Sequence, residues 1–106
     1  MNVPSLVTEY LEAERAGDAK RLSLCFAEDG VVHDEGRELR GREAIQRWKE
    51  DADAKYRYIS EPLEAVVDTD SVSLRAKVTG DFPGSPVEVA QTFTIAGGQI
   101  VLLEIH

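Results

Sequence analysis

The segment VSLRAKVT (Val72–Thr79) alternates apolar and polar residues without a break. Such alternation is typical of a β-strand with one buried face and one face in solvent. The neighbouring segments 56–67, 87–95 and 100–105 also have strand character, and turn residues separate them. Gly97-Gly98 predicts a two-residue hairpin turn before the last segment. The second half of the chain therefore predicts an antiparallel sheet.

The first half of the chain places its apolar residues at helical spacing instead. Residues 4–16 carry an apolar stripe that includes Tyr10. A short second helix follows Gly17 and Asp18, residue types that favour a helix C-terminal cap and an N-terminal cap. After a short strand at 31–35, a third helix has one apolar face, formed by Ala44, Ile45, Trp48 and Ala52. We predict an α+β fold, a mainly antiparallel sheet with three helices packed on one face.

Length and charge narrow the possible partners. We expect one domain spanning residues 1–106, because the chain is short enough for one core. The net charge of -8 disfavours nucleic acid and anionic membranes. No apolar run approaches the roughly 20 residues that span a bilayer. The first residues lack signal-peptide features and the single cysteine excludes an internal disulfide, so we expect a cytoplasmic protein.

Two polar residues break otherwise apolar strand faces. Asp34 shares a face with Val32, and a carboxylate held away from water is a candidate proton acceptor. Gln91 shares a face with Val89 and with other apolar residues, and a buried amide needs hydrogen-bond partners. With Tyr10 from the first helix, these groups come from three elements. We expect one cavity to collect them.

Each candidate also has an ordinary structural explanation. Asp34 can cap the turn before Gly36 or pair with Arg40 or Arg42. Tyr10 can be a core aromatic whose hydroxyl reaches the backbone. His33 alternates away from Asp34, and no metal-ligand spacing is present, so we expect no metal site. Cys25 lies in an apolar helical stripe and predicts packing rather than reactivity.

Several segments together resemble a known superfamily. They are YL at 10–11, AGD at 16–18, CFAEDGVVHDEG at 25–36 and RGREAI at 40–45. In this order they resemble the nuclear transport factor 2-like superfamily, and most closely its SnoaL-like polyketide cyclases and ketosteroid isomerases. The resemblance covers essentially the whole chain. It implies a cone-shaped curved sheet that encloses a pocket closed by three helices, and a homodimer through the outer face of the sheet.

The resemblance also implies roles for particular residues. Asp34 matches the isomerase's general base, and Tyr10 matches the tyrosine that donates to the substrate oxyanion. Gln91 stands where the isomerase has a protonated aspartic acid, and Lys49 stands where it often has a supporting tyrosine. An amide is a weaker donor than a carboxylic acid, and losing one good donor costs about 2.7–4 kcal/mol of transition-state stabilisation. This departure argues against authentic steroid isomerisation, whereas proton transfer next to a carbonyl is still compatible with these residues.

Three functions compete. The first is a cofactor-independent isomerase or cyclase in which Asp34 moves a proton next to a carbonyl, with Tyr10 and Gln91 as catalytic partners. The expected ligand-binding wall consists of Trp48, Val32, Phe26 and Val89. The second is a non-catalytic binder of a small apolar molecule on the same fold, and the third is an interaction domain with a vestigial pocket. For the homodimer, the apolar character of Ala90, Thr92, Thr94 and Leu102 predicts the interface.

Overall fold

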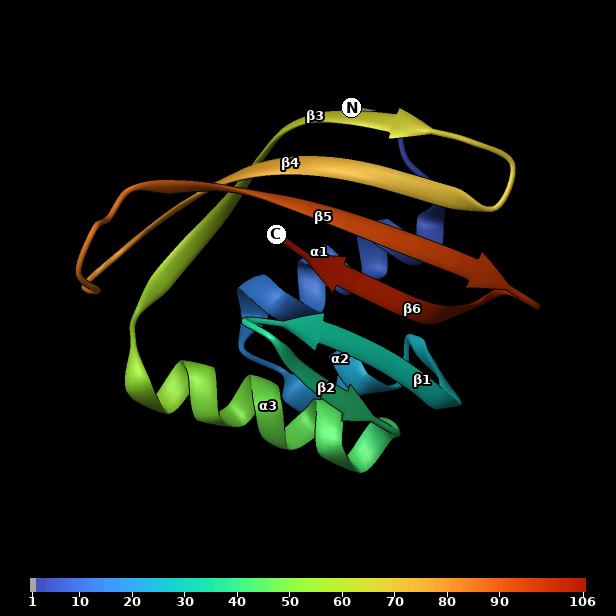
Figure 1. The fold of residues 1–106 in the computed structure, drawn as a ribbon, viewed down its shortest axis with the longest axis horizontal. Helices are drawn as coiled ribbons and strands as arrows, with labels where there is room; N and C mark the ends of the chain where they lie inside the picture. The colour runs from blue at the N-terminus through green and yellow to red at the C-terminus, as the bar shows by residue number, and fades with distance from the viewer. Residues whose placement is uncertain (1) are drawn as a thin grey trace.

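The structure is a computed structural model that describes residues 2–106. Within these residues the elements are α1 (Ser5–Ala16), α2 (Ala19–Ser23), β1 (Phe26–Asp34), β2 (Arg37–Arg40), α3 (Arg42–Lys55), β3 (Tyr58–Val67), β4 (Ser71–Gly80), β5 (Val87–Ala96) and β6 (Gln99–Ile105). The strands form one sheet in the order β2-β1-β6-β5-β4-β3 (Figure 1). Strands β3 to β6 pair antiparallel, and β1 pairs parallel with β6. The predicted α+β class and mainly antiparallel sheet are confirmed.

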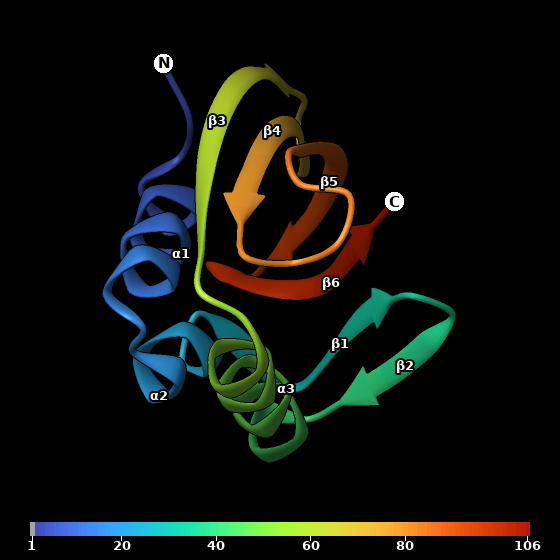
Figure 2. The same ribbon diagram turned by 90° about the vertical axis from the view of Figure 1, so that its left-hand side faces the viewer.

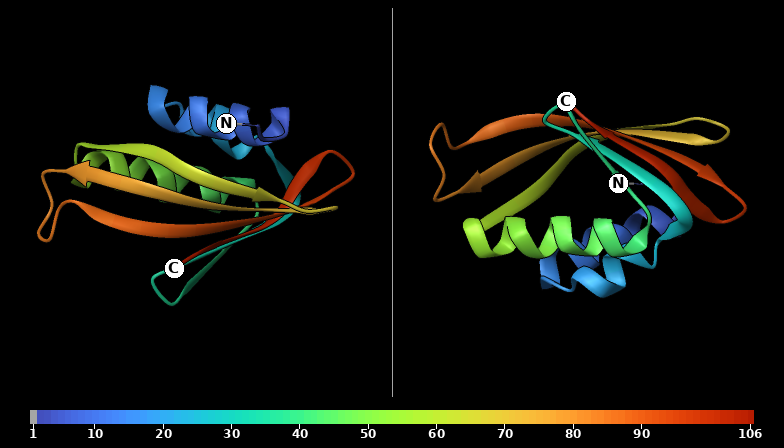
Figure 3. Two further views of the ribbon diagram at one scale, coloured as in Figure 1. Left: turned by 90° about the horizontal axis from the view of Figure 1, so that it is seen from above. Right: turned by 60° about the horizontal axis from the view of Figure 1, so that its bottom comes forward.

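The sheet is strongly curved, and the helices lie against its concave side (Figures 2 and 3). Irregular register marks three places along it, between Phe26 and Val31, between Pro62 and Glu64, and between Thr94 and Ile95. Such irregularities bend a strand and increase its local twist. The curvature leaves an open cone, with α3 along one side and the β4–β5 loop at the rim.

The core lies between α1 and the concave face of the sheet. Tyr10, Phe26 and Phe93 are fully buried, and the Tyr10 ring meets the other two edge-on, with centroids 5.1 Å from Phe93 and 6.1 Å from Phe26. Gly17 ends α1 in the left-handed conformation at φ 68°, and the Asp18 side chain accepts from the Arg21 N–H to begin α2. Both expected caps are confirmed.

Element boundaries differ from the sequence prediction by more than one residue at three places. Strand β1 begins at Phe26 rather than at Val31, because Phe26 pairs with Ile100 of β6, a partner far along the chain. Strand β3 begins at Tyr58, since Tyr56 still forms the C-cap of α3. Cys25 follows α2 instead of belonging to it; it is buried, and burial raises the pKa of its thiol to about 11.

The outer face of the sheet carries both apolar and charged side chains. Ala90 is exposed, and Thr92, Thr94 and Leu102 are half-buried in one chain alone. Arg75 joins Glu64 and Glu88 across three strands of this face. The predicted dimer through this surface stays a prediction. Among residues 2–106, none of the helices combines the length and the apolar character that a membrane span requires.

Candidate functional site

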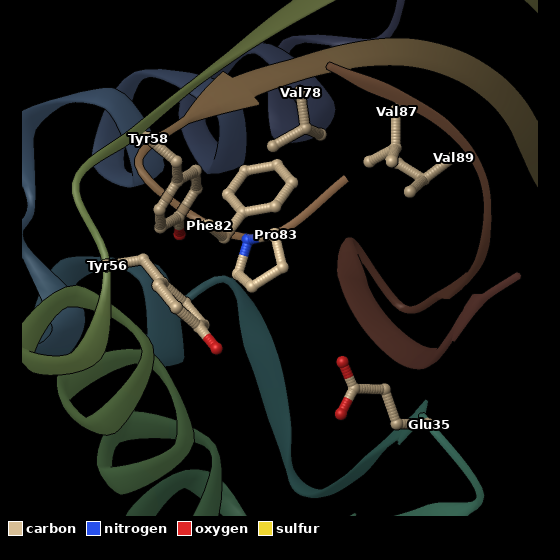
Figure 4. A pocket seen from close by; sticks show the side chains of 8 residues that line it. All are labelled: Glu35, Tyr56, Tyr58, Val78, Phe82, Pro83, Val87 and Val89. Atoms are coloured by element: carbon tan, nitrogen blue, oxygen red, sulfur yellow. The ribbon is translucent and has the colours of Figure 1, made fainter. Parts of the chain in front are cut away.

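An open cavity of about 430 Å³ lies at the rim of the cone (Figure 4). Its lining residues come from the end of α3, three strands and two loops; they are Glu35, Tyr56, Tyr58, Val78, Phe82, Pro83, Val87 and Val89. The aromatic side chains Tyr56, Tyr58 and Phe82 lie on one side, and the Glu35 carboxylate lies across from them. A mostly apolar concave wall with few polar groups is typical of a small-molecule site.

The strand pairing explains the apolar part of this wall. Val78 of β4 pairs with Val87 of β5, and Ala76 pairs with Val89, so these side chains share the concave face of the sheet. Val89 is therefore the one member of the expected ligand-binding set that lines the cavity.

Asp34 is the last residue of β1 and is half-buried, on the same face as the fully buried Val32. The indole Nε1–H of Trp48 donates to Asp34 Oδ2 at 3.0 Å. The alternative pairing with arginine is not present, since Arg40 contacts Glu38 and the Nε of Arg42 donates to the backbone carbonyl of Phe26. Asp34 itself is not part of the cavity wall, although its neighbour Glu35 is.

Tyr10 is sealed in the core, and its hydroxyl has no hydrogen-bond partner among the described residues. Burial raises the pKa of Tyr10 well above its usual value, and the negative charges of nearby groups, among them Glu14 and Asp34, add to the shift. The hydroxyl therefore stays protonated.

Gln91 is also buried, and its Oε1 has no partner among residues 2–106. Unpartnered buried polar atoms are rare, and they often mark a place where a water or ligand is bound. The structure thus joins Trp48 to Asp34 and places Val89 in the cavity wall. Tyr10, Gln91, Phe26 and Val32 are buried and are not part of that wall.

A charged cluster beside the cavity was missed from sequence. The Lys49 ammonium donates to Asp53 Oδ1 at 2.7 Å and to the Tyr58 hydroxyl at 2.6 Å, and the lysine side chain is only 3% exposed. Glu14 of α1 faces the same cluster; burial raises the pKa of its carboxyl to about 6, and the Lys49 charge opposes that rise. A signal was present, since Lys49 follows Ile45 by four residues and so shares its buried helix face.

Comparison with known proteins agrees with this geometry. A curved six-stranded sheet with three helices against it is the nuclear transport factor 2-like fold. The sequence pattern of the SnoaL-like domain matches residues 7–103, so the chain belongs to the SnoaL-like family. No curated protein matches it.

Solved structures give the same fold. A Sinorhizobium meliloti protein provisionally named polyketide cyclase is 46% identical, with a TM-score of 0.94, over 98% of this chain and 95% of that one. A Catenulispora acidiphila protein with a ketosteroid isomerase-like fold, solved with trimethylamine, is 26% identical, with a TM-score of 0.89, over 99% of this chain and 86% of that one. A Xanthomonas campestris protein, also provisionally named polyketide cyclase, is 21% identical, with a TM-score of 0.85 and coverages of 95% and 86%; at this identity it shows the fold alone.

Proposed function

We propose that the protein binds a small, largely apolar carbonyl compound in the rim cavity and that Asp34 transfers a proton next to the carbonyl. The observation that carries the proposal is the hydrogen bond from Trp48 to one oxygen of Asp34. An indole offers a single N–H, so it orients the carboxylate and leaves the second oxygen available as a proton acceptor. No arginine or lysine occupies that oxygen within residues 2–106.

The chemistry follows from an oriented carboxylate on the residue that precedes Glu35, which lines the apolar cavity. Asp34 removes a proton from the carbon next to the carbonyl, and the electron pair moves onto the carbonyl oxygen to give an enolate. Returning the proton to a different carbon gives an isomerase. Attack of the enolate carbon on a second carbonyl of the same molecule, followed by protonation of the new alkoxide, gives a cyclase. The name of the 46% identical Sinorhizobium meliloti protein favours the cyclase form.

A second candidate is binding without turnover. It is favoured by the burial of Tyr10 and Gln91, the two expected oxyanion donors, neither of which lines the cavity. Without those donors the enolate loses stabilisation that oxyanion sites supply. In this case Asp34 and Trp48 only orient a bound ligand.

The experiment compares turnover of a β,γ-unsaturated ketone by the wild type and by Asp34→Asn. Asparagine keeps the shape and cannot accept the proton, so the rate falls by about 10² or more if Asp34 is the base. The matched control is Asp29→Asn, the same chemical change at an exposed position of the same strand. Unchanged turnover in Asp34→Asn rules out the base, and ligand binding with no turnover in the wild type selects the second candidate.

A further inference from the structure

We infer that the Tyr58 hydroxyl, which accepts a hydrogen bond from Lys49, donates its own proton to the carbonyl oxygen of a neutral ligand in the rim cavity. The inference rests on the proposed function, because it assigns the group that holds the carbonyl on which Asp34 acts. Tyr10 was the tyrosine expected in this role, but it is fully buried and does not line the cavity. Tyr58 does line the cavity (Figure 4).

The direction of one hydrogen bond makes Tyr58 a donor. The Lys49 ammonium carries three N–H donors and no acceptor, so in its 2.6 Å contact the Tyr58 oxygen accepts. The hydroxyl proton must therefore point to a different acceptor. Asp53 competes for this proton, and its Oδ1 already accepts from Lys49 at 2.7 Å. Because a hydroxyl rotates, a ligand carbonyl in the cavity can take the proton in place of Asp53.

The lysine strengthens this donor relative to the same tyrosine without a cation at its oxygen. A cation that donates to a hydroxyl oxygen polarises its O–H bond, and the low exposure of Lys49 limits screening by water. Tyr56 provides the contrast within the same cavity. Both tyrosines have a lysine over the ring, Lys49 at 4.7 Å from the Tyr58 centroid and Lys55 at 5.2 Å from the Tyr56 centroid, but only Lys49 also donates to the hydroxyl among the described residues, and Lys55 is exposed.

The charges around Tyr58 select the kind of ligand. Glu14 from α1, Asp34 from β1 and Asp53 from α3 act on Tyr58, and Lys49 is the cation that contacts its hydroxyl. Arg15 and Arg57 line the neighbouring hollow that Tyr58 shares with Lys49. Burial first, and then these carboxylates, raise the pKa of Tyr58, so the hydroxyl keeps its proton and stays a donor. The same negative field disfavours a phenolate or carboxylate in the cavity. The ligand class is therefore a neutral ketone, aldehyde or lactone.

The test uses 1-tetralone labelled with ¹³C at its carbonyl, and its hydrocarbon counterpart tetralin. In the wild type, the infrared carbonyl stretch of bound tetralone moves below its value in an apolar solvent. One net hydrogen bond also favours the ketone over the hydrocarbon by about 2- to 12-fold in affinity. Tyr58→Phe keeps the ring and removes the donor, so it loses both the spectral shift and the preference.

Two comparison variants isolate the lysine. Lys49→Met reduces the carbonyl shift, whereas Lys55→Met, which removes the same charge from an exposed position of the same helix, leaves it unchanged. If Lys49→Met does not fold, the two tyrosine variants decide alone, since Tyr56→Phe retains the shift and Tyr58→Phe does not. A shift that survives Tyr58→Phe, or that disappears in Tyr56→Phe instead, overturns the inference, and so does a wild type that does not bind tetralone.

The two proposals fail separately. If the wild type shows no turnover but its carbonyl shift depends on Tyr58, proton transfer by Asp34 is overturned and the role of Tyr58 as donor is supported. Turnover that Asp34→Asn abolishes, together with a carbonyl shift indifferent to Tyr58→Phe, overturns the Tyr58 donor only.

Discussion

Trp48 donates its indole N–H to Asp34 across 3.0 Å and so links the middle of α3 to the last residue of β1. The helix thereby sets the direction of a carboxylate that ends a strand, at the point where the chain turns toward the cavity residue Glu35. Both partners are half-buried, so water competes with this bond only in part.

Trp48→Phe tests this link. Phenylalanine keeps most of the apolar contact and removes the N–H, and a hydrogen bond to a charged group contributes about 1.5–3 kcal/mol. We expect turnover of the ketone substrate to fall by about 10-fold, less than in Asp34→Asn, because the base is still present but no longer oriented. Steady-state kinetics measures the effect. A loss as large as that of Asp34→Asn would mean that Trp48 does more than orient the carboxylate.

Lys49→Met tests the buried ion pair as a stability element. Removing one partner of a buried pair typically costs 3–5 kcal/mol, and we expect about 2–3 kcal/mol here because Asp53 is 32% exposed. Urea unfolding measures the loss. The matched control, Lys49→Met combined with Asp53→Asn, removes both charges and should recover part of the lost stability. A double variant that is less stable than Lys49→Met alone would contradict the pairing.

The raised pKa of Glu14, about 6, predicts a pH dependence of stability. The folded state binds this proton more tightly than the unfolded chain does, so protonated Glu14 stabilises the fold. This stability is fully present below the unfolded value near 4.5, and it is lost as the pH rises through about 6. The loss is about 1–2 kcal/mol by pH 7.

Glu14→Gln removes this titration. The difference in unfolding free energy between the wild type and Glu14→Gln, measured by urea titration at several pH values from 4.5 to 7.5, isolates it from the other carboxylates. We expect the variant to gain stability relative to the wild type as the pH rises. A difference that is independent of pH would contradict the raised pKa.

Gly80→Ala should destabilise the wall of the rim cavity. A Cβ at position 80 would collide with the backbone oxygen of Arg57 and crowd the Tyr58 side chain and the Phe82 ring. Overpacking of this kind costs about 1–3 kcal/mol. Thermal or urea unfolding measures the loss, with Thr79→Ala at the exposed neighbouring position as control. Equal stability of the two variants would show that the backbone around Gly80 and Arg57 shifts at little cost to accommodate a Cβ.

The homodimer predicted through the outer face of the sheet is open to a direct measurement. Light scattering at micromolar concentration should give twice the 11.7 kDa mass of one chain. Ala90→Glu places a charge on this face and should shift the equilibrium to monomer. A monomeric wild type would exclude this dimer at that concentration.

Residue periodicity predicted most of the fold but little of the cavity. The alternation at 72–79 predicts β4 correctly, because the pattern of one buried strand face is contained in the local sequence and does not depend on which strand pairs with it. The start of β1 was missed because Phe26 pairs with Ile100, which local sequence cannot reveal. The burial of Lys49 and its contact with Tyr58 were missed for a related reason. A lysine is expected in solvent unless a partner compensates its burial, and this partner comes from a strand that begins beyond the helix.

The parallel pairing of β1 with β6 also bears on how the chain reaches its fold. Strand β6 lies between β1 and β5, so the earliest strand of the sheet finds its central neighbour only after residues 99–105 are available. Contacts between such distant segments carry a large loop-closure entropy and slow folding. On the ribosome, α1, α2 and β1 therefore wait without a completed sheet until the final strand emerges. During that interval the aromatic core at Tyr10 and Phe26 is open to aggregation.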